Sequence, residues 1–245
     1  MKLILTGATG AAGSQILKDA VLDPAVTSVT VLARRALPDW LTSTIPENNK
    51  TTTLIVNDFS KYPEDLPAKL ASHDACIWAL GSTSVGKTEQ EYTVVTYDYV
   101  VKMVEALGEV GKVRENNKEP FRFVYVSGNG ADQDENSASR MFARVKGRTE
   151  KYLLSLPPSS KIQSYALRPG GFFPDDPNIM KNTRSTSERF ILGLVRPVMS
   201  TFMSSRLIPV GDLSRFALEA AKGKWDSEPE KVFSNAKMKE LVAGN

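Results

Sequence analysis

Cysteine and histidine are almost absent from this chain. The one cysteine, Cys76, has no partner for a disulfide within the chain, and the one histidine, His73, leaves no histidine and cysteine set of the kind that binds zinc. We therefore expect no metal site and a reducing, cytoplasmic compartment. A strand predicted from Lys2 onward also leaves no room for a signal peptide before the fold.

A strong charge of one sign and a long apolar run are missing as well. The chain has 31 Lys and Arg against 28 Asp and Glu, a formal net charge of +3, with no basic run that stands out. This balance argues against a nucleic-acid partner. No apolar run approaches the roughly 20 residues that a membrane span requires. With 245 residues, 41% of them hydrophobic, the chain can form one α/β domain with a small appended lobe.

The strongest motif lies at the start of the chain. Leu3–Leu5 predict a buried strand, residues 6–13 contain nothing bulky, and Ser14–Val21 predict a helix. The glycines of the turn form the pattern G-x-x-G-x-x-G. Small residues let the backbone approach a pyrophosphate, and the first N–H groups of the helix favour its charge. The context predicts dinucleotide binding, against the alternative of a purely structural turn, by residues Gly7, Thr9, Gly10, Ala11 and Ala12.

Strands and helices alternate along the rest of the chain, which predicts a doubly wound parallel sheet of the Rossmann type. We treat residues 1–245 as one domain, with about 171–210 and 225–245 forming a small substrate or lid lobe. Further strands are predicted at Val26–Ala33, Leu54–Val56, Ala75–Leu80, Phe121–Ser127, Ser164–Leu167 and near Phe233. Helices are predicted at Asp65–Ser72, Glu91–Leu107, Ser139–Leu156, Leu213–Ala221 and Asn235–Val242, with Asp212 as the N-cap of the helix that follows it.

The residues after the second and third strands indicate which dinucleotide binds. An acidic residue after the second strand would favour NAD, whereas this chain has Arg34 and Arg35 there. Guanidinium groups bind phosphate well, so NADP(H) is predicted, unless both arginines are simply solvated. After the third strand, Asn57, Asp58 and Phe59 are placed to meet the adenine. Asp58 could instead be the N-cap of the next helix.

The residues after the fourth strand match a second nucleotide motif. GSTSVGKT, from Gly81 to Thr88, fits the Walker A pattern G-x-x-x-x-G-K-[ST]. The first strand-to-helix turn is already a dinucleotide loop, however, and the next strand ends on Ser127 instead of the Asp that would hold magnesium. We therefore expect Ala79, Leu80 and Gly81 to form a wall beside the adenosine ribose and the diphosphate.

The later motifs carry a family resemblance. FVYVSGNGAD, RMFARVKGRTEKYL and ALRPGGFFP, together with LGST and YDYV earlier in the chain, resemble a short-chain dehydrogenase/reductase. The chain is most similar to the atypical, NmrA-like branch and to the Tat-interactive protein 2 group. The resemblance covers residues from Leu3 to about Ala220. It implies NADP(H) binding through the glycine loop and an arginine after the second strand.

The superfamily uses a serine, a tyrosine and a lysine for catalysis, with the tyrosine four residues before the lysine. By this resemblance Ser127 and Lys146 bind the substrate oxygen and the nicotinamide ribose, but Phe142 stands where the tyrosine would be. Tyr97, Tyr125 or a water could replace the missing proton donor. The phenylalanine could also be an engineered substitution, or a core residue of its helix.

The substrate side is expected after the sixth strand. Pro169, Gly170 and Gly171 predict a turn whose backbone approaches the nicotinamide. Ser187–Met203 has apolar residues at helical spacing and fits a core helix, a lid that favours an apolar or aromatic substrate, or a surface for a protein partner.

Three functions remain open at this point. The first is an NADP(H)-dependent oxidoreductase that acts on a carbonyl or alcohol. The second is a non-catalytic NADP(H)-binding regulator of the NmrA type. The third is an isomerase or cyclase built on the same fold.

Overall fold

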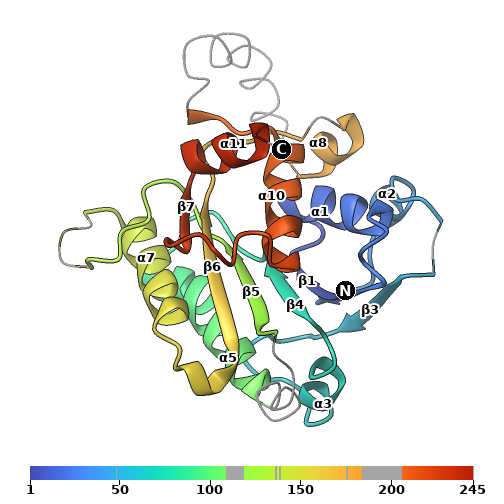
Figure 1. Ribbon diagram of the computed structural model, residues 1–245, viewed down its shortest axis with the longest axis horizontal. Coiled ribbons are helices and arrows are strands. Elements are labelled where there is room, and N and C mark those ends of the chain that lie inside the picture. The colour runs from blue at the N-terminus through green and yellow to red at the C-terminus, as the bar shows by residue number, and fades with distance from the viewer. Residues whose placement is uncertain are drawn as a thin grey trace.

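The computed structural model describes residues 1–47, 49–108, 119–135, 137, 139–174, 176–183 and 206–244. One parallel sheet has the strand order β3-β2-β1-β4-β5-β6-β7, which confirms the predicted doubly wound fold (Figure 1). Its strands are β1 (Lys2–Thr6), β2 (Ser28–Ala33), β3 (Thr51–Ile55), β4 (Ala75–Trp78), β5 (Phe121–Val126), β6 (Ile162–Arg168) and β7 (Val232–Ser234).

The described helices fall mostly where the periodicity predicts them, but the short helices Asp39–Thr42 and Pro177–Thr183 were not predicted. The predicted helix over Glu91–Leu107 passes through a π-helical turn, and α10 begins at Val210, so the assignment of Asp212 as an N-cap is wrong. Asp212 lies in the first turn and pairs with Arg215 at 2.7 Å. The helices are α1 (Ala11–Leu22), α2 (Asp39–Thr42), α3 (Leu66–Leu70), α4 (Glu89–Thr93), η1 (Val94–Asp98, π), α5 (Tyr99–Ala106), α7 (Met141–Leu154), η2 (Pro158–Ser160, 3-10), α8 (Pro177–Thr183), α10 and α11 (Asn235–Ala243); α10 ends at Lys222.

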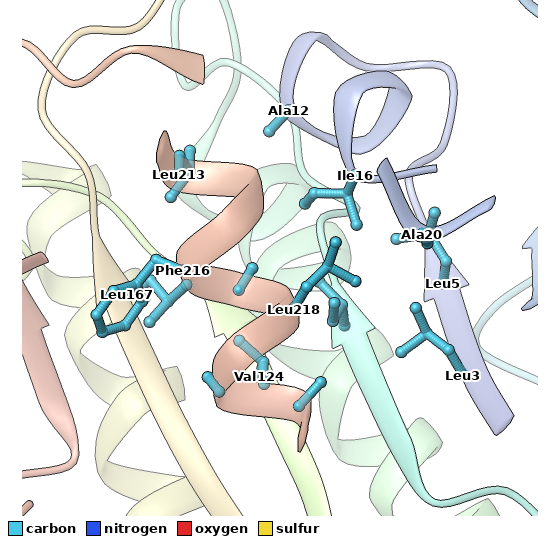
Figure 2. Packing of buried hydrophobic residues seen from close by; sticks show 14 of the residues in the cluster. Leu3, Leu5, Ala12, Ile16, Ala20, Val124, Leu167, Leu213, Phe216 and Leu218 are labelled. Atoms are coloured by element: carbon cyan, nitrogen blue, oxygen red, sulfur yellow. The ribbon is translucent and has the colours of Figure 1, made fainter. Parts of the chain in front are cut away.

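Both faces of the sheet are covered by helices, and successive strand residues contribute to opposite faces. Leu3 and Leu5 of β1 face one core with α1 and α10, which lie side by side in Figure 2. Ile4, between them, faces the other core, which includes residues of α3, α5 and α7. In Figure 2, Ile16 of α1 and Phe216 of α10 point into the first core. The strands are apolar at successive positions because both faces of the sheet are buried.

The C-terminal part of the chain is joined to the main sheet. β7 pairs with β6 in parallel, and α11 packs against α10, so the predicted lobe around 225–245 is continuous with the domain. Of the predicted segment 171–210, positions 175 and 184–205 lie outside the described residues, and with them the helix predicted at Ser187–Met203. Among the helices that are described, none has the length and apolarity of a membrane span.

Candidate coenzyme and catalytic site

The strand order reverses between β1 and β4, where ligands of doubly wound folds bind beyond the carboxyl ends of the strands. The loops that follow these two strands touch. Gly7 has a φ of +71°, and a Cβ atom there would lie 2.4 Å from the carbonyl oxygen of Ala79. Leu80 donates its backbone N–H to the hydroxyl of Thr6 at 3.3 Å. The structure thus brings the predicted glycine loop and the predicted wall at Ala79–Gly81 together.

The start of α1 forms a cradle for an anion. Gly10 caps the helix without a side chain, and the first turn has no acidic residue. The N–H groups of this first turn have no acceptor within the helix, so they can bind a phosphate oxygen. A Cβ at Gly13 would lie 2.1 Å from the carbonyl oxygen of Gly7, which keeps the turn tight. These residues fit the diphosphate of a dinucleotide.

A pocket of about 420 Å³ opens at the end of β2, beside this cradle. Arg34 and Arg35 line it from one side and Thr9 from the glycine loop, with Asn182 of α8 also at the wall. Both arginines are exposed, and neither has an ion-pair or hydrogen-bond partner among the residues that the structure describes. Two exposed guanidinium groups that line a pocket together with Thr9 of the glycine loop fit a 2′-phosphate.

The residues after β3 have different surroundings. Asp58 accepts hydrogen bonds from the backbone N–H and the hydroxyl of Ser60, at 2.8 and 2.7 Å, and these bonds lower the pKa of its exposed carboxyl. Asp65 precedes α3, so the assignment of Asp58 as a helix N-cap is wrong. The ring of Phe59 is buried and packs edge-on against Trp78. Phe59 as a whole is buried and offers no side chain to an adenine, whereas Asn57 and Asp58 are exposed.

The Walker-like loop has a local structural role. Thr88 is the N-cap of α4 and forms a capping box with Glu91: the Thr88 hydroxyl donates to the Glu91 carboxylate at 2.9 Å and accepts from its N–H at 3.3 Å. In a P-loop this hydroxyl would bind magnesium. Among the described residues, no group of three or more His, Cys, Asp or Glu is placed to hold a metal ion. The geometry supports helix capping at this loop.

A buried carboxylate joins the ends of β5 and β6 to α7. Glu150 is fully buried and accepts a hydrogen bond from the hydroxyl of Ser127 at 2.5 Å. Arg168, at the end of β6, donates to the same carboxylate from Nε at 3.0 Å and from Nη2 at 2.5 Å, and Gln133 donates at 3.2 Å. The hydroxyl of the predicted site residue Ser127 therefore donates its hydrogen bond to Glu150. Sequence reasoning missed Glu150, whose one signal was its position one turn after Lys146.

Lys146 belongs to α7, and its ammonium group lies at the carboxyl end of β5. Its ammonium donates to the carbonyl oxygens of Ser127 at 2.8 Å and Val126 at 3.3 Å, and it lies 5.5 Å from the centre of the Tyr125 ring. Burial lowers the pKa of Lys146 to about 8, although the Glu150 carboxylate acts in the opposite direction. A Cβ at Gly128 would be 3.9 Å from the Lys146 nitrogen. Gly128 therefore lies beside the lysine and presents no side chain to it.

Phe142 lies one turn before Lys146 on α7 and is partly exposed, with its ring tip 3.4 Å from where a Cβ of Gly130 would be. The two tyrosines considered as replacement donors have different surroundings. Tyr125 is buried, and this burial raises the pKa of its phenol. Tyr97 packs against Tyr152 and under Arg148, on a side of α7 away from Lys146. The structure supports neither tyrosine as a proton donor.

The turn after β6 is held by the C-terminal part of the chain. Gly170 donates its N–H to Asn235 at 2.8 Å, and a Cβ there would lie 1.9 Å from the carbonyl oxygen of Arg206. Gly171 forms a parallel bridge with Leu207, and the carbonyl of Pro169 accepts from the N–H of Asn129 at 2.8 Å. The close approach that requires glycine at 170 is thus made to residue 206. Contact of this turn with a nicotinamide stays a prediction.

The fold and the crevice define an NAD(P)-binding Rossmann protein of the short-chain dehydrogenase/reductase type. A protein-family model described as NAD(P)H-binding matches residues 7–195, and the chain belongs to this family. Among solved structures, Gre2 of Candida albicans in complex with NADPH has a TM-score of 0.69 at 15% identity, over 96% of this chain and 77% of that chain. A short-chain oxidoreductase from Burkholderia thailandensis has a TM-score of 0.69 at 14% identity, over 100% and 93%. At these identities the likeness concerns the fold.

Curated relatives confirm the atypical branch of the superfamily. Over 169 residues the chain is 31% identical to protein fmp52, mitochondrial, of Emericella nidulans, covering 68% of this chain and 64% of that protein. It is 31% identical over 165 residues to leucinostatins biosynthesis cluster protein T of Purpureocillium lilacinum, with 66% and 55% covered. HTATIP2 of Rattus norvegicus is 30% identical over 151 residues, with 60% and 54% covered. The chain thus spans between about half and two thirds of the length of these relatives.

Proposed function

We propose that this chain is an NADP(H)-dependent oxidoreductase that acts on a carbonyl or alcohol group of an apolar or aromatic small molecule. The observation that carries the proposal is that the cradle at the start of α1 adjoins the pocket lined by Thr9, Arg34 and Arg35. The cradle would hold the diphosphate and the arginines the 2′-phosphate. When bound, NADPH supplies a hydride to a substrate carbon.

The residues of the chain would orient the coenzyme at three places. The first-turn N–H groups of α1 bind the diphosphate, the loop at Ala79–Gly81 borders the ribose, and Lys146 lies beside the nicotinamide ribose. Phe142 gives this end of the crevice an apolar wall, which favours an apolar substrate.

Two measurements test the proposal in sequence. Fluorescence titration of the purified protein should show NADPH bound more tightly than NADH, because only NADPH offers a 2′-phosphate to the arginines. Incubation with NADPH deuterated at C4 and a panel of aldehydes and ketones should place deuterium in an alcohol product, detected by mass spectrometry. Failure to bind either dinucleotide would overturn the whole proposal.

A non-catalytic NADP(H)-binding regulator is the second candidate. Phe142 has no proton to give, and the Ser127 hydroxyl is turned to Glu150, so two of the three catalytic groups of the superfamily are not presented by this site. Coenzyme binding without deuterium transfer to any carbonyl tested would favour this candidate. A regulator of this kind would act through a protein partner. Co-purification in the presence and in the absence of NADPH would test for such a partner.

The cytoplasmic location also remains part of the proposal. The names of the fmp52 relatives place those proteins in mitochondria. Subcellular fractionation of the full-length protein would decide between the two compartments for this chain.

A further inference from the structure

This inference rests on the proposed function and concerns the source of the proton in the reaction. When a carbonyl is reduced, its oxygen takes a proton, and in the superfamily a tyrosine gives it. Phe142 has none to give, and Tyr97 packs against Tyr152, away from Lys146. Tyr125 lies beside Lys146 but is buried, and this burial raises the pKa of its phenol. Ser127 has its own proton directed to Glu150 at 2.5 Å. The reaction therefore needs a donor other than these four residues.

Lys146 has the geometry of such a donor. An ammonium group carries three hydrogens. Two of them go to the carbonyl oxygens of Val126 and Ser127, which fixes the position of the nitrogen and leaves the third hydrogen. Gly128 lies beside the lysine, since a Cβ there would be 3.9 Å from the Lys146 nitrogen, and as a glycine it presents no side chain to the ammonium.

The groups that face Lys146 from the neighbouring elements are few among the described residues. Glu150 follows it by one turn on α7, and Tyr125 of β5 presents the face of its ring. Arg168 of β6 neutralises Glu150, with a contact of 2.5 Å. The carboxylate that favours the charged lysine is thereby shared with another cation, and the burial of the ammonium outweighs its effect on the lysine pKa.

We propose that Lys146 itself donates the proton to the substrate oxygen in this site. The carbonyl carbon receives the hydride from NADPH, the electron pair of the C=O π bond moves to oxygen, and an O–H bond forms with the hydrogen of the lysine nitrogen. The electron pair of the broken N–H bond stays on nitrogen, and water then reprotonates the neutral amine. A lysine whose pKa burial has lowered to about 8 is suited to give a proton near neutral pH.

The first test needs no substrate. The protein is treated with isotopically coded acetic anhydride over a range of pH, and the labelling of each lysine is quantified by mass spectrometry. Lys146 should reach half of its maximal labelling near pH 8, and NADPH should protect it. Exposed Lys151 on the same helix is the internal control, and NADPH should leave its labelling unchanged. A Lys146 profile centred above pH 10 overturns the proposal, whatever activity the protein shows.

The second test uses NADPH with phenanthrenequinone and 4-nitrobenzaldehyde as probes. Lys146→Arg keeps a cation that can donate to both carbonyls but does not release its proton at this pH. We expect kcat to fall about 100-fold or more while the Kd for NADPH changes by less than about threefold. The double variant Lys146→Arg with Phe142→Tyr should recover part of the lost rate. An unchanged rate in Lys146→Arg overturns the proposal. If the unmodified protein does not bind NADPH at all, the proposed function is overturned instead.

Discussion

The hydroxyl of Ser127 donates a hydrogen bond to Oε1 of Glu150 at 2.5 Å, and both side chains are buried. The same carboxylate accepts two more donors from the Arg168 guanidinium, so the ends of β5 and β6 are fastened to α7 through one acidic group. This arrangement makes Ser127 part of a buried polar network. It also fixes the helix that carries Lys146 against the sheet.

Replacing Glu150 by Gln should destabilise the protein strongly. The change removes the negative charge and leaves the Arg168 guanidinium partly buried without its partner, which costs about 3–5 kcal/mol for a buried pair. Urea denaturation followed by circular dichroism measures the loss.

A double-variant cycle supplies the control. Arg168→Met alone should also destabilise, and the double variant Glu150→Gln with Arg168→Met should lose less than the sum of the two single variants, because neither charge is then left alone. Additive losses would contradict the network and would reduce these contacts to independent ones.

Arg34→Ala should weaken NADPH binding about 10- to 100-fold and leave NADH binding nearly unchanged. A charge-assisted hydrogen bond to phosphate of about 1.5–3 kcal/mol accounts for this range. Arg215→Ala, which removes an exposed arginine of α10 that pairs with Asp212, is the matched control and should bind both dinucleotides normally. Fluorescence titration measures all four affinities, and an equal loss for NADH would contradict a 2′-phosphate role for Arg34.

Gly7→Ala should abolish dinucleotide binding and lower the unfolding temperature. Alanine at position 7 would be strained, because the backbone there has the left-handed φ of +71°. Its Cβ atom would also lie 2.4 Å from the Ala79 carbonyl oxygen, so the loops that follow β1 and β4 would have to separate. Gly211→Ala, where a Cβ meets nothing within 4 Å, is the control and should behave like the unmodified protein. Scanning calorimetry with and without NADPH distinguishes the variants, and full binding by Gly7→Ala would refute the predicted loop.

The titration of Lys146 should appear in the pH dependence of stability. Because burial lowers the pKa of Lys146 to about 8, whereas lysine in an unfolded chain titrates near 10.4, the unfolded state holds more protons between these values. The free energy of unfolding should therefore gain from this group as pH rises through that window, by at most about 1.4 kcal/mol per pH unit. Urea denaturation from pH 7 to 10 should show a smaller slope in Lys146→Met. Identical slopes would contradict the lowered pKa.

Much of the fold could be predicted from the sequence, because its main signals are local. Apolar runs such as Leu3–Leu5 and the small residues that follow them specify a strand and a tight turn without distant information. The structure confirms the resulting sheet. It also shows a contact between the glycine loop and Ala79 that was not itself predicted.

The parts that sequence reasoning missed depend on long-range contacts. Glu150 reads as a surface residue of an amphipathic helix, and only its pairing with Arg168 from another strand explains its burial. Phe59 likewise follows a strand end, where ligands are expected, but its ring turns into the core beside Trp78. Asp212 has the side chain of an N-cap, yet α10 starts two residues earlier, at Val210.

Isothermal titration of the purified protein with NADPH, with ATP as the competing ligand, tests the central claim most directly. The account predicts that NADPH binds with one site per chain, that Arg34→Ala weakens it, and that ATP with magnesium does not bind at Lys87. Absence of any dinucleotide binding, or tight ATP binding that Lys87→Ala abolishes, would contradict the claim.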